Sequence, residues 1–187
     1  MNLLSTRRFT AVTLLFGALA GFAASFLLSI DKFKLLKDSQ FNPSCSISEK
    51  LNCKSVMLSN QAEAFGFPNS FLGIAAFAIF IAIAVAMLGN VEFPSWFWKL
   101  AFVGVLFGII FSHWLAYQTT FVIGTLCPYC MVAWFGNFLI LSSVIQENLR
   151  KRADSEGIAL LKIIGFMPIL HLVWLFMVVG FAYIGVS

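Results

Sequence analysis

FTAVTLLFGALAGFAASFLLSI, residues 9–30, runs for 22 residues without a charged side chain. A helix crosses the roughly 30 Å hydrocarbon core of a bilayer with about 20 such residues. In lipid the run must be helical, because backbone polar groups left unpaired there are costly. Ala18-Leu19-Ala20 resembles a signal-peptide cleavage site, but the run exceeds the usual signal core of about 7–15 apolar residues. This stretch therefore predicts a membrane-spanning helix and an all-α integral membrane protein.

Four further stretches have the length and composition of membrane spans. They lie at residues 69–89, 98–117, 128–147 and 160–184. The last is interrupted only by Lys162, Pro168 and His171. Residues 31–68 form a long loop between the first two spans. The sequence thus predicts a single membrane domain over residues 1–187 with five transmembrane helices.

The composition agrees with this prediction. The chain is 60% hydrophobic and only 11% charged, whereas a soluble domain is nearer to half apolar and a quarter charged. Its net charge of +4 comes from basic residues scattered between the apolar runs. Nucleic-acid binding requires a continuous basic surface, which this pattern lacks. We therefore expect membrane lipid, and no nucleic acid, around the protein.

The distribution of basic residues predicts the orientation. With five spans, one side of the membrane receives Arg7, Arg8, Lys99, Arg150, Lys151 and Arg152. On the other side, the connection 119–126 is uncharged, and the lysines of the long loop are largely balanced by acidic residues. The positive-inside rule then places the N-terminus in the cytoplasm. The C-terminus and all four cysteines would lie on the outer face of a bacterial inner membrane.

Cys127-Pro128-Tyr129-Cys130 opens the fourth span. Proline suits the first turn of a helix, where its missing N–H is not needed. Cys127 would lie at the helix start, where free N–H groups and the helix dipole stabilise a thiolate. Cys130 would lie one turn deeper and closer to lipid. One sulfur would thus meet water-borne partners, and the other a membrane-soluble electron acceptor.

The second cysteine pair, Cys45 and Cys53, lies in the long outer loop. Alone, such a pair is more often a structural disulfide than a catalyst. Beside a CxxC motif on the same face, thiol–disulfide exchange between the pairs becomes the better interpretation. A zinc site is the alternative, but the separation of eight residues differs from the usual short ligand spacing, and we expect no metal.

Several motifs follow one another in a specific order. They are Cys45 and Cys53, Ser59, Phe65-Gly66-Phe67-Pro68-Asn69-Ser70-Phe71-Leu72-Gly73, Leu115-Ala116-Tyr117-Gln118 and Cys127-Pro128-Tyr129-Cys130. In this order the chain resembles the vitamin K epoxide reductase family over roughly residues 9–145. The resemblance implies a four-helix bundle around a quinone, capped by the first outer loop. DsbB-type proteins are the nearest competitor, but their CxxC motif precedes the spaced pair.

The resemblance also implies roles for the cysteines. Cys45 would meet a thioredoxin-like partner, Cys53 would exchange with Cys127, and Cys130 would face the quinone, which is ubiquinone or menaquinone. The fifth span resembles bacterial family members, in many of which it leads into a fused thioredoxin domain. Because the chain stops at Ser187, we expect a separate DsbA-like thiol oxidase as electron donor.

The resemblance implies quinone contacts as well. Ser59 matches a loop serine of the family, and Asn69 matches an asparagine that hydrogen-bonds a quinone carbonyl in members resembling the animal enzymes. Trp134 stands where those enzymes have tyrosine; four residues after Cys130, it shares that helix face and can stack on the quinone. The missing hydroxyl argues against epoxide chemistry. Ser59 and Asn69 also have a simpler interpretation as helix caps.

Phe65 is a candidate quinone contact for a different reason. With Leu51, Leu58 and Ala62 it recurs at near-helical spacing, which predicts an amphipathic segment on the membrane surface. That segment would cover the quinone pocket. His113 and His171 are ionisable residues within spans and thus functional candidates. The resemblance gives them no role, so we interpret them as hydrogen-bonded packing residues.

These observations predict a membrane thiol:quinone oxidoreductase that reoxidises its partner and so supports disulfide formation. One alternative is reduction of vitamin K quinone or its epoxide, driven by luminal thiols. A second alternative is a membrane scaffold in which the four cysteines form staples or a metal site.

Overall fold

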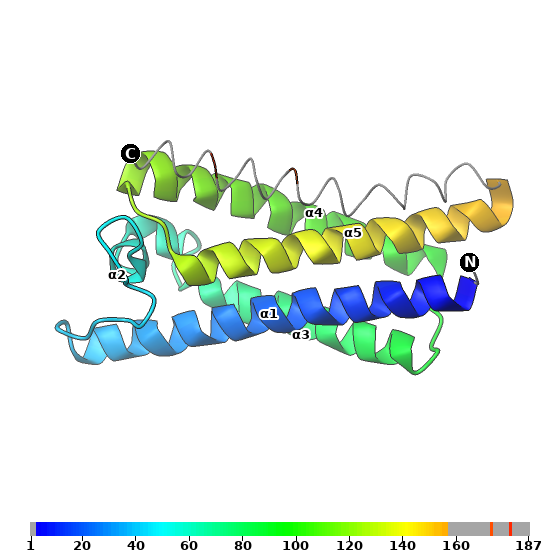
Figure 1. The fold of residues 1–187 in the computed structure, drawn as a ribbon, viewed down its shortest axis with the longest axis horizontal. Helices are drawn as coiled ribbons and strands as arrows, with labels where there is room; N and C mark the ends of the chain where they lie inside the picture. The colour runs from blue at the N-terminus through cyan, green and yellow to red at the C-terminus, as the bar shows by residue number, and fades with distance from the viewer. Residues whose placement is uncertain (1–2, 157–172, 174–179, 181–187) are drawn as a thin grey trace.

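The computed structural model describes residues 3–156, Val173 and Gly180, and the described part of the chain is a helical bundle (Figure 1). The four long helices are α1 (Leu3–Lys37), α3 (Asn69–Leu88), α4 (Ser95–Tyr117) and α5 (Pro128–Glu156). Two short helices, α2 (Cys53–Met57) and η1 (Asn60–Glu63), lie between α1 and α3, and the π-helical turn η2 (Gln118–Ile123) extends α4.

All four long helices contain a stretch that is long and apolar enough to cross a membrane. The predicted all-α membrane fold is therefore confirmed. The predicted span 160–184 lies outside the described residues, apart from Val173 and Gly180.

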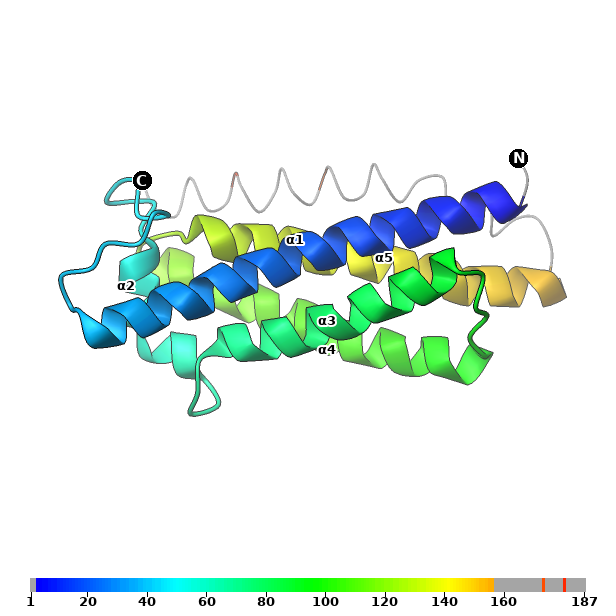
Figure 2. The ribbon, with the colours of Figure 1, turned by 90° about the horizontal axis from the view of Figure 1, so that it is seen from below.

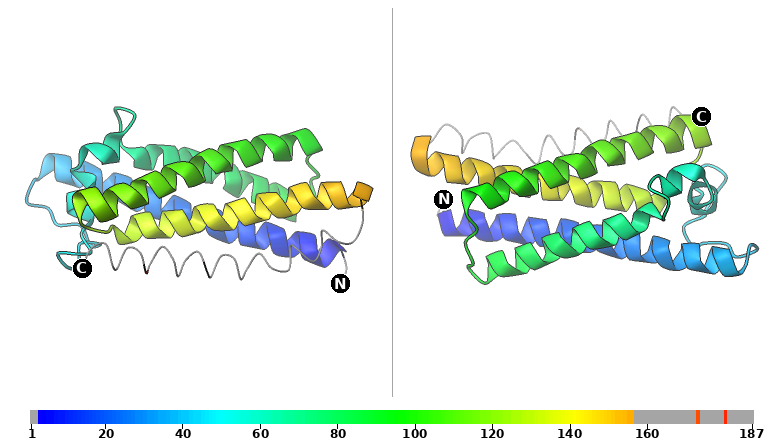
Figure 3. Two further views of the ribbon diagram at one scale, coloured as in Figure 1. Left: turned by 90° about the horizontal axis from the view of Figure 1, so that it is seen from above. Right: turned by 180° about the vertical axis from the view of Figure 1, so that it is seen from behind.

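Helix α1 forms the centre of the bundle, because it packs along both α3 and α5 (Figure 2). Helix α4 packs on α5 instead, as the two views in Figure 3 show. The consecutive helices α3 and α4 thus make their main contacts with different helices, α3 with α1 and α4 with α5. This arrangement leaves space between them in which a cavity forms.

Glycines allow α1 and α5 to approach closely. Gly17 and Gly21 form a G-x-x-x-G pattern on α1, and Gly136 of α5 packs against both. A Cβ atom at Gly136 would lie 2.6 Å from the carbonyl oxygen of Gly17. Small residues of this kind let membrane helices gain close van der Waals contact.

Gly136→Ala should therefore destabilise the bundle by about 1–3 kcal/mol, because the added methyl group overpacks the α1–α5 contact. Gly104→Ala is the matched control, because a Cβ atom there meets nothing within 4 Å. Thermal unfolding in detergent measures both variants. Equal melting temperatures for the two variants would contradict the assigned contact.

Helices α1 and α4 begin earlier than predicted, at Leu3 and Ser95 rather than at residues 9 and 98, and α1 and α5 end later than predicted. Helix α1 continues seven residues past 30, to Lys37, so the outer loop begins at residue 38 rather than 31. The charges that suggested its end are compatible with helix: Asp31 pairs with Lys34 one turn later at 3.7 Å, and cations in the last turn complement the helix dipole. Helix α5 likewise reaches Glu156 rather than 147.

The predicted amphipathic helix through residues 51–65 is wrong as a continuous element. Ser59 has extended backbone angles, φ −76° and ψ 153°, and separates α2 from η1. We call residues 53–63 the cap, because α2 and η1 lie together at one end of the bundle (Figure 1).

The opposite end of the bundle gathers charged residues. Glu92, in the α3–α4 connection, lies 3.9 Å from Arg7 of α1 and 3.6 Å from Lys151 of α5. Glu147 is buried on α5 and pairs with Arg150 at 2.6 Å. The two ends of the bundle therefore differ: one holds an ionic cluster and the other the cap.

Candidate active site

All four cysteines lie at the capped end of the bundle. Cys45 and Cys53 form a disulfide with an S–S distance of 2.04 Å, whereas Cys127 and Cys130 are free thiols. The Sγ atom of Cys127 is 3.1 Å from the Sγ atom of Cys53. The structure thus brings the two pairs together through one close sulfur–sulfur contact.

A parallel β-bridge between Leu51 and Leu126 creates this contact. The N–H of Asn52 donates to the carbonyl of Leu126 at 2.9 Å, and the N–H of Leu126 donates to the carbonyl of Lys50 at 2.8 Å. Each bonded segment leads directly into a cysteine, Cys53 on one side and Cys127 on the other. The backbone pairing therefore fixes the separation of the two sulfurs.

Both cysteines of the contact stand at helix starts. Cys53 is the first residue of α2, which Asn52 caps by accepting a hydrogen bond from the N–H of Ser55 at 3.2 Å. Cys127 directly precedes Pro128, the first residue of α5. The predicted helix start at Pro128 is thus confirmed.

The environment of Cys127 favours its thiolate. A hydrogen bond from the Cys130 thiol lowers the pKa of Cys127 most, and backbone N–H groups of Cys130 and Tyr129 lower it further. Burial acts in the opposite direction, but the pKa of Cys127 is still below its ordinary value. The backbone N–H of Cys130 lies 3.4 Å from the Cys127 sulfur. Cys127 is therefore more often a thiolate than an ordinary cysteine, and a thiolate is the form that attacks a disulfide such as the one at Cys53.

Substitution of Cys130 should show how much its thiol hydrogen bond, rather than the backbone N–H groups, lowers the pKa of Cys127. Cys130→Ala should raise the pKa of Cys127, because the thiol hydrogen bond is lost, whereas Cys130→Ser keeps a donor and should leave the pKa lowered. Both variants are made in a chain that lacks Cys45 and Cys53, so that Cys127 stays a free thiol and is the one cysteine that titrates. The ultraviolet absorbance of its thiolate, followed against pH, measures the midpoint. Equal midpoints in both variants would show that the side chain at position 130 is not the cause.

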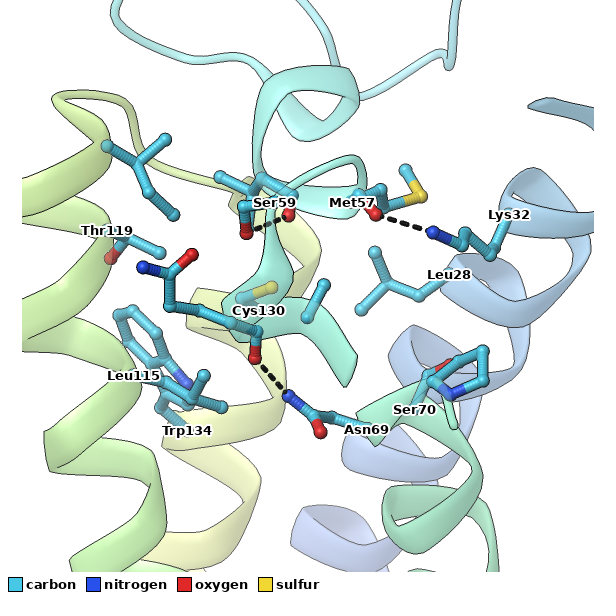
Figure 4. A pocket seen from close by; sticks show the side chains of 15 residues that line it. Leu28, Lys32, Met57, Ser59, Asn69, Ser70, Leu115, Thr119, Cys130 and Trp134 are labelled. Carbon is cyan, nitrogen blue, oxygen red and sulfur yellow. Dashed lines mark hydrogen bonds between the residues drawn. The ribbon is translucent and has the colours of Figure 1, made fainter. Parts of the chain in front are cut away.

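Cys130 faces a cavity beneath the cap (Figure 4). This upper cavity has a volume of about 80 Å³. Its walls come from α1, the cap, α3, the α4–η2 region and α5, with Leu28, Lys32, Met57, Asn69, Leu115, Thr119, Cys130 and Trp134 among the lining residues. Trp134 is buried one turn after Cys130. The free thiol nearest to the bundle interior therefore lines a mainly apolar cavity that is partly open to its surroundings.

Three of the four residues selected as quinone contacts line this cavity: Ser59, Asn69 and Trp134. Phe65 lines neither cavity of the bundle. It is half exposed, and its ring packs on Phe111 of α4 with centroids 5.4 Å apart. Phe65 thus lies beside the cap rather than within the site.

The side chain of Asn69 holds the cap in place. Its Nδ2 donates to the carbonyl of Gln61 at 2.7 Å, and its Oδ1 accepts from the N–H of Ala64 at 3.1 Å. The alternative role of Asn69 as helix cap is wrong, because Asn69 is the first residue of α3 and Pro68 precedes it at the cap position. Ser59 donates to the carbonyl of Val56 at 2.7 Å and makes no side-chain capping bond to η1.

Lys32 and Gln61 are cavity residues that the motifs did not select. Lys32 of α1 donates to the carbonyl of Met57 at 2.8 Å and pairs with Glu63 at 2.9 Å, so it fastens both short helices of the cap to α1. Its signal in the sequence is a charge directly after an apolar run. Gln61 also lines the cavity, and its Nε2 lies 3.5 Å from Oε1 of Gln118, a contact that only the folded chain creates.

Lys32→Met should loosen the cap. The loss of the charged hydrogen bond to Met57 should lower the hydrogen-exchange protection of residues 53–63 by about 1–2 kcal/mol. The ion pair adds little to this figure, because the Glu63 side chain is 41% exposed and screened by water.

Lys34→Met is the matched control, because Lys34 pairs with Asp31 within α1 rather than with the cap. Hydrogen exchange followed by mass spectrometry compares the two variants. Unchanged protection of residues 53–63 in Lys32→Met would rule out the fastening role.

A second, lower cavity of about 180 Å³ continues from the first toward the middle of the bundle. The two share Leu28, Asn69, Ser70, Leu115, Cys130 and Trp134. The lower part is lined by glycines and aromatic rings of α3 and α4, the helices that pack on different neighbours. Its polar feature is Asn137 of α5, which donates to the hydroxyl of Ser112 at 2.9 Å.

The two histidines differ in what the structure shows. The Nδ1 atom of His113 lies 2.8 Å from the carbonyl oxygen of Ile109, and its ring packs near Phe138. This placement agrees with the interpretation of His113 as a hydrogen-bonded packing residue. His171 lies outside the described residues.

Residues 12–145 match the model of the vitamin K epoxide reductase family. The chain belongs to this family. The matched range contains α3, α4, both cysteine pairs, the cap and most of α1 and α5. A comparison with curated proteins gives no match.

Family membership establishes the general chemistry. The protein is a membrane oxidoreductase with a thiol–disulfide site, in a family whose members use quinones and thioredoxin-like partners. The site contains one disulfide, between Cys45 and Cys53, and two free thiols, those of Cys127 and Cys130.

Proposed function

We propose that this protein oxidises the dithiol of a DsbA-like, thioredoxin-fold partner and reduces a membrane quinone. The observation that carries the proposal is the distance of 3.1 Å between the sulfur atoms of Cys53 and Cys127. A thiolate at this distance from a disulfide sulfur is placed for exchange. The reaction converts protein dithiol and quinone into protein disulfide and quinol.

Electrons would enter at Cys45. A partner thiolate attacks the sulfur of Cys45 and releases Cys53, which attacks Cys127 of an oxidised Cys127–Cys130 pair and releases Cys130. The second partner thiol then resolves the mixed disulfide at Cys45. Cys45 finally displaces Cys127 from Cys53 and restores the loop disulfide. Two electrons and two protons have then moved from the partner to the CxxC motif.

The last step takes place at the cavity. The Cys127–Cys130 dithiol gives two electrons and two protons to the quinone, so a disulfide and a quinol form. The structure has the Cys45–Cys53 disulfide together with free Cys127 and Cys130. This is the state that would directly precede quinone reduction.

The lining of the cavities supports a quinone as acceptor. Amide groups of Asn69 and Gln61 and the indole N–H of Trp134 surround the upper cavity and supply the donors that quinone carbonyls require. The apolar lower cavity would accommodate the isoprenoid chain. This lining suits both ubiquinone and menaquinone. Trp134 brings no acidic hydroxyl group, which favours quinone over epoxide reduction.

The two ends of the bundle support an outward-facing relay. The ionic end contains Arg7, Arg150 and Lys151, as the positive-inside rule requires for the cytoplasmic side of an inner membrane. The cysteine end would then face the periplasm, where a DsbA-like partner is available.

Cys130→Ser tests the relay. Without the Cys130 thiol, Cys127 cannot form its own disulfide, and its attack on Cys53 should trap a Cys53–Cys127 bond and release Cys45 as a free thiol. Mass-spectrometric disulfide mapping of the purified protein detects this bond. Cys127→Ser is the control and should retain only Cys45–Cys53.

Turnover is measured in the same preparations. Quinone reduction in detergent, with a reduced thioredoxin-fold protein as donor, should be abolished in Cys130→Ser. Normal turnover in that variant would sink the mechanism. A vitamin K epoxide reductase would also reduce the epoxide, which we expect this protein to leave unchanged.

A further inference from the structure

Three cysteine sulfurs form a compact, buried cluster. The Sγ atoms of Cys45, Cys53 and Cys127 all lie within 4.8 Å of one another. They come from the outer loop, the start of α2 and the start of α5, so the fold rather than a sequence motif assembles them. One disulfide now joins two of them. Reduction of that disulfide leaves three thiols facing a common point.

The spacing of the three sulfurs suits a tetrahedral metal ion. Zinc binds thiolate sulfur at about 2.3 Å, which places two sulfur ligands of a tetrahedron about 3.8 Å apart. The sulfurs of Cys53 and Cys127 are now 3.1 Å apart, and the whole cluster fits within 4.8 Å. To reach that geometry, the sulfurs of Cys53 and Cys127 would move about 0.7 Å further apart. The sulfurs of Cys45 and Cys53, 2.04 Å apart in the disulfide, would separate by about 1.8 Å once that bond is reduced.

The surroundings favour a soft cation. The three cysteines are at most 3% exposed and pack among Leu28, Leu35, Val56 and Met57. Thiolates in such a site select zinc over magnesium or calcium, which require oxygen ligands. The backbone N–H of Cys130, 3.4 Å from the Cys127 sulfur, would stabilise the bound thiolate as an outer-shell donor.

We propose that the chain, once its loop disulfide is reduced, binds one Zn²⁺ ion through the thiolates of Cys45, Cys53 and Cys127. The fourth position is taken by water. Binding releases three thiol protons and involves no electron transfer. The metal occupies both partners of the central exchange contact, so it stops the relay in the reduced state. The oxidised chain does not bind it, because the disulfide sulfurs are not available as thiolates.

The consequence for activity rests on the proposed function, but the site itself does not. Zinc would arrest the protein when electron donors exceed quinone, because the fully reduced form then accumulates. Return to activity would require loss of the metal. The activity of the protein would in this way depend both on the concentration of Zn²⁺ and on the ratio of quinol to quinone in the membrane.

Cobalt titration of the purified full-length protein in detergent tests the site. Under argon, the chain reduced with a phosphine should bind one equivalent of Co²⁺ and develop the visible bands and the thiolate charge-transfer band of tetrahedral cobalt. Zn²⁺ should bleach these bands. The chain contains only four cysteines, so no other thiols contribute. The untreated oxidised chain should show no bands.

Single substitutions identify the ligands. Cys127→Ser and Cys45→Ser should each weaken Co²⁺ binding by more than the roughly 10–100-fold that loss of an outer-shell partner costs. Cys130→Ser is the matched control, because it removes a thiol from the same region without removing a proposed ligand, and it should retain stoichiometric binding. Gel filtration in detergent shows that each variant is folded.

The outcomes separate this proposal from the proposed function. Absence of cobalt bands in the reduced wild type, or their loss in Cys130→Ser alone, overturns the metal site and leaves the quinone reductase intact. Stoichiometric zinc in the protein as isolated, without quinone reduction, would instead overturn the proposed function and favour a structural metal site. The result that we expect is slow recovery of turnover after the chain has been reduced in the presence of Zn²⁺, and fast recovery once a chelator has removed the metal.

Discussion

The backbone pairing of Leu51 with Leu126 is the contact on which the site depends. Cys53 and Cys127 are 74 residues apart in the chain, and neither the packing of the bundle nor their own helices fixes their separation. Two hydrogen bonds between the connections that lead into these cysteines do so. The bridge positions the sulfurs through main-chain groups. It also brings the cap over the point at which α5 begins.

The arrangement of the long helices creates the other part of the site, which is the pair of cavities beside Cys130. Glycines draw α1 and α5 together, while α3 packs on α1 and α4 on α5. The cavities therefore form where the bundle is least tightly closed, and Cys130 lies at their upper end. Asn69 of α3 and Lys32 of α1, two neighbouring helices, hold the cap over this space. Close packing of α1 with α5 thus leaves partly open cavities between the less closely packed helices.

Apolar length and proline positions made much of the fold predictable. Starts at Asn69 and Pro128 were correct because prolines mark them, whereas the end of α1 was placed too early because charges can continue a helix beyond the membrane. The four cysteines were evident from their motifs. Lys32 and Gln61 could not be found, since their roles arise from contacts with the cap across the fold. The G-x-x-x-G pattern at Gly17 was visible, but its partner Gly136 depends on the helix arrangement.

In the proposed relay the partner attacks Cys45, so the burial of this sulfur would determine which reductants can reach it. Its side chain is only 3% exposed, within an apolar cluster that includes Phe41 and Tyr129. Small thiols in the surrounding medium would need to reach a sulfur that the loop covers, so uncontrolled reduction of the loop disulfide is slowed. A folded partner has enough contact area to displace the covering segment as it binds. If electrons enter at Cys45 as proposed, its burial would reserve the path for a protein donor.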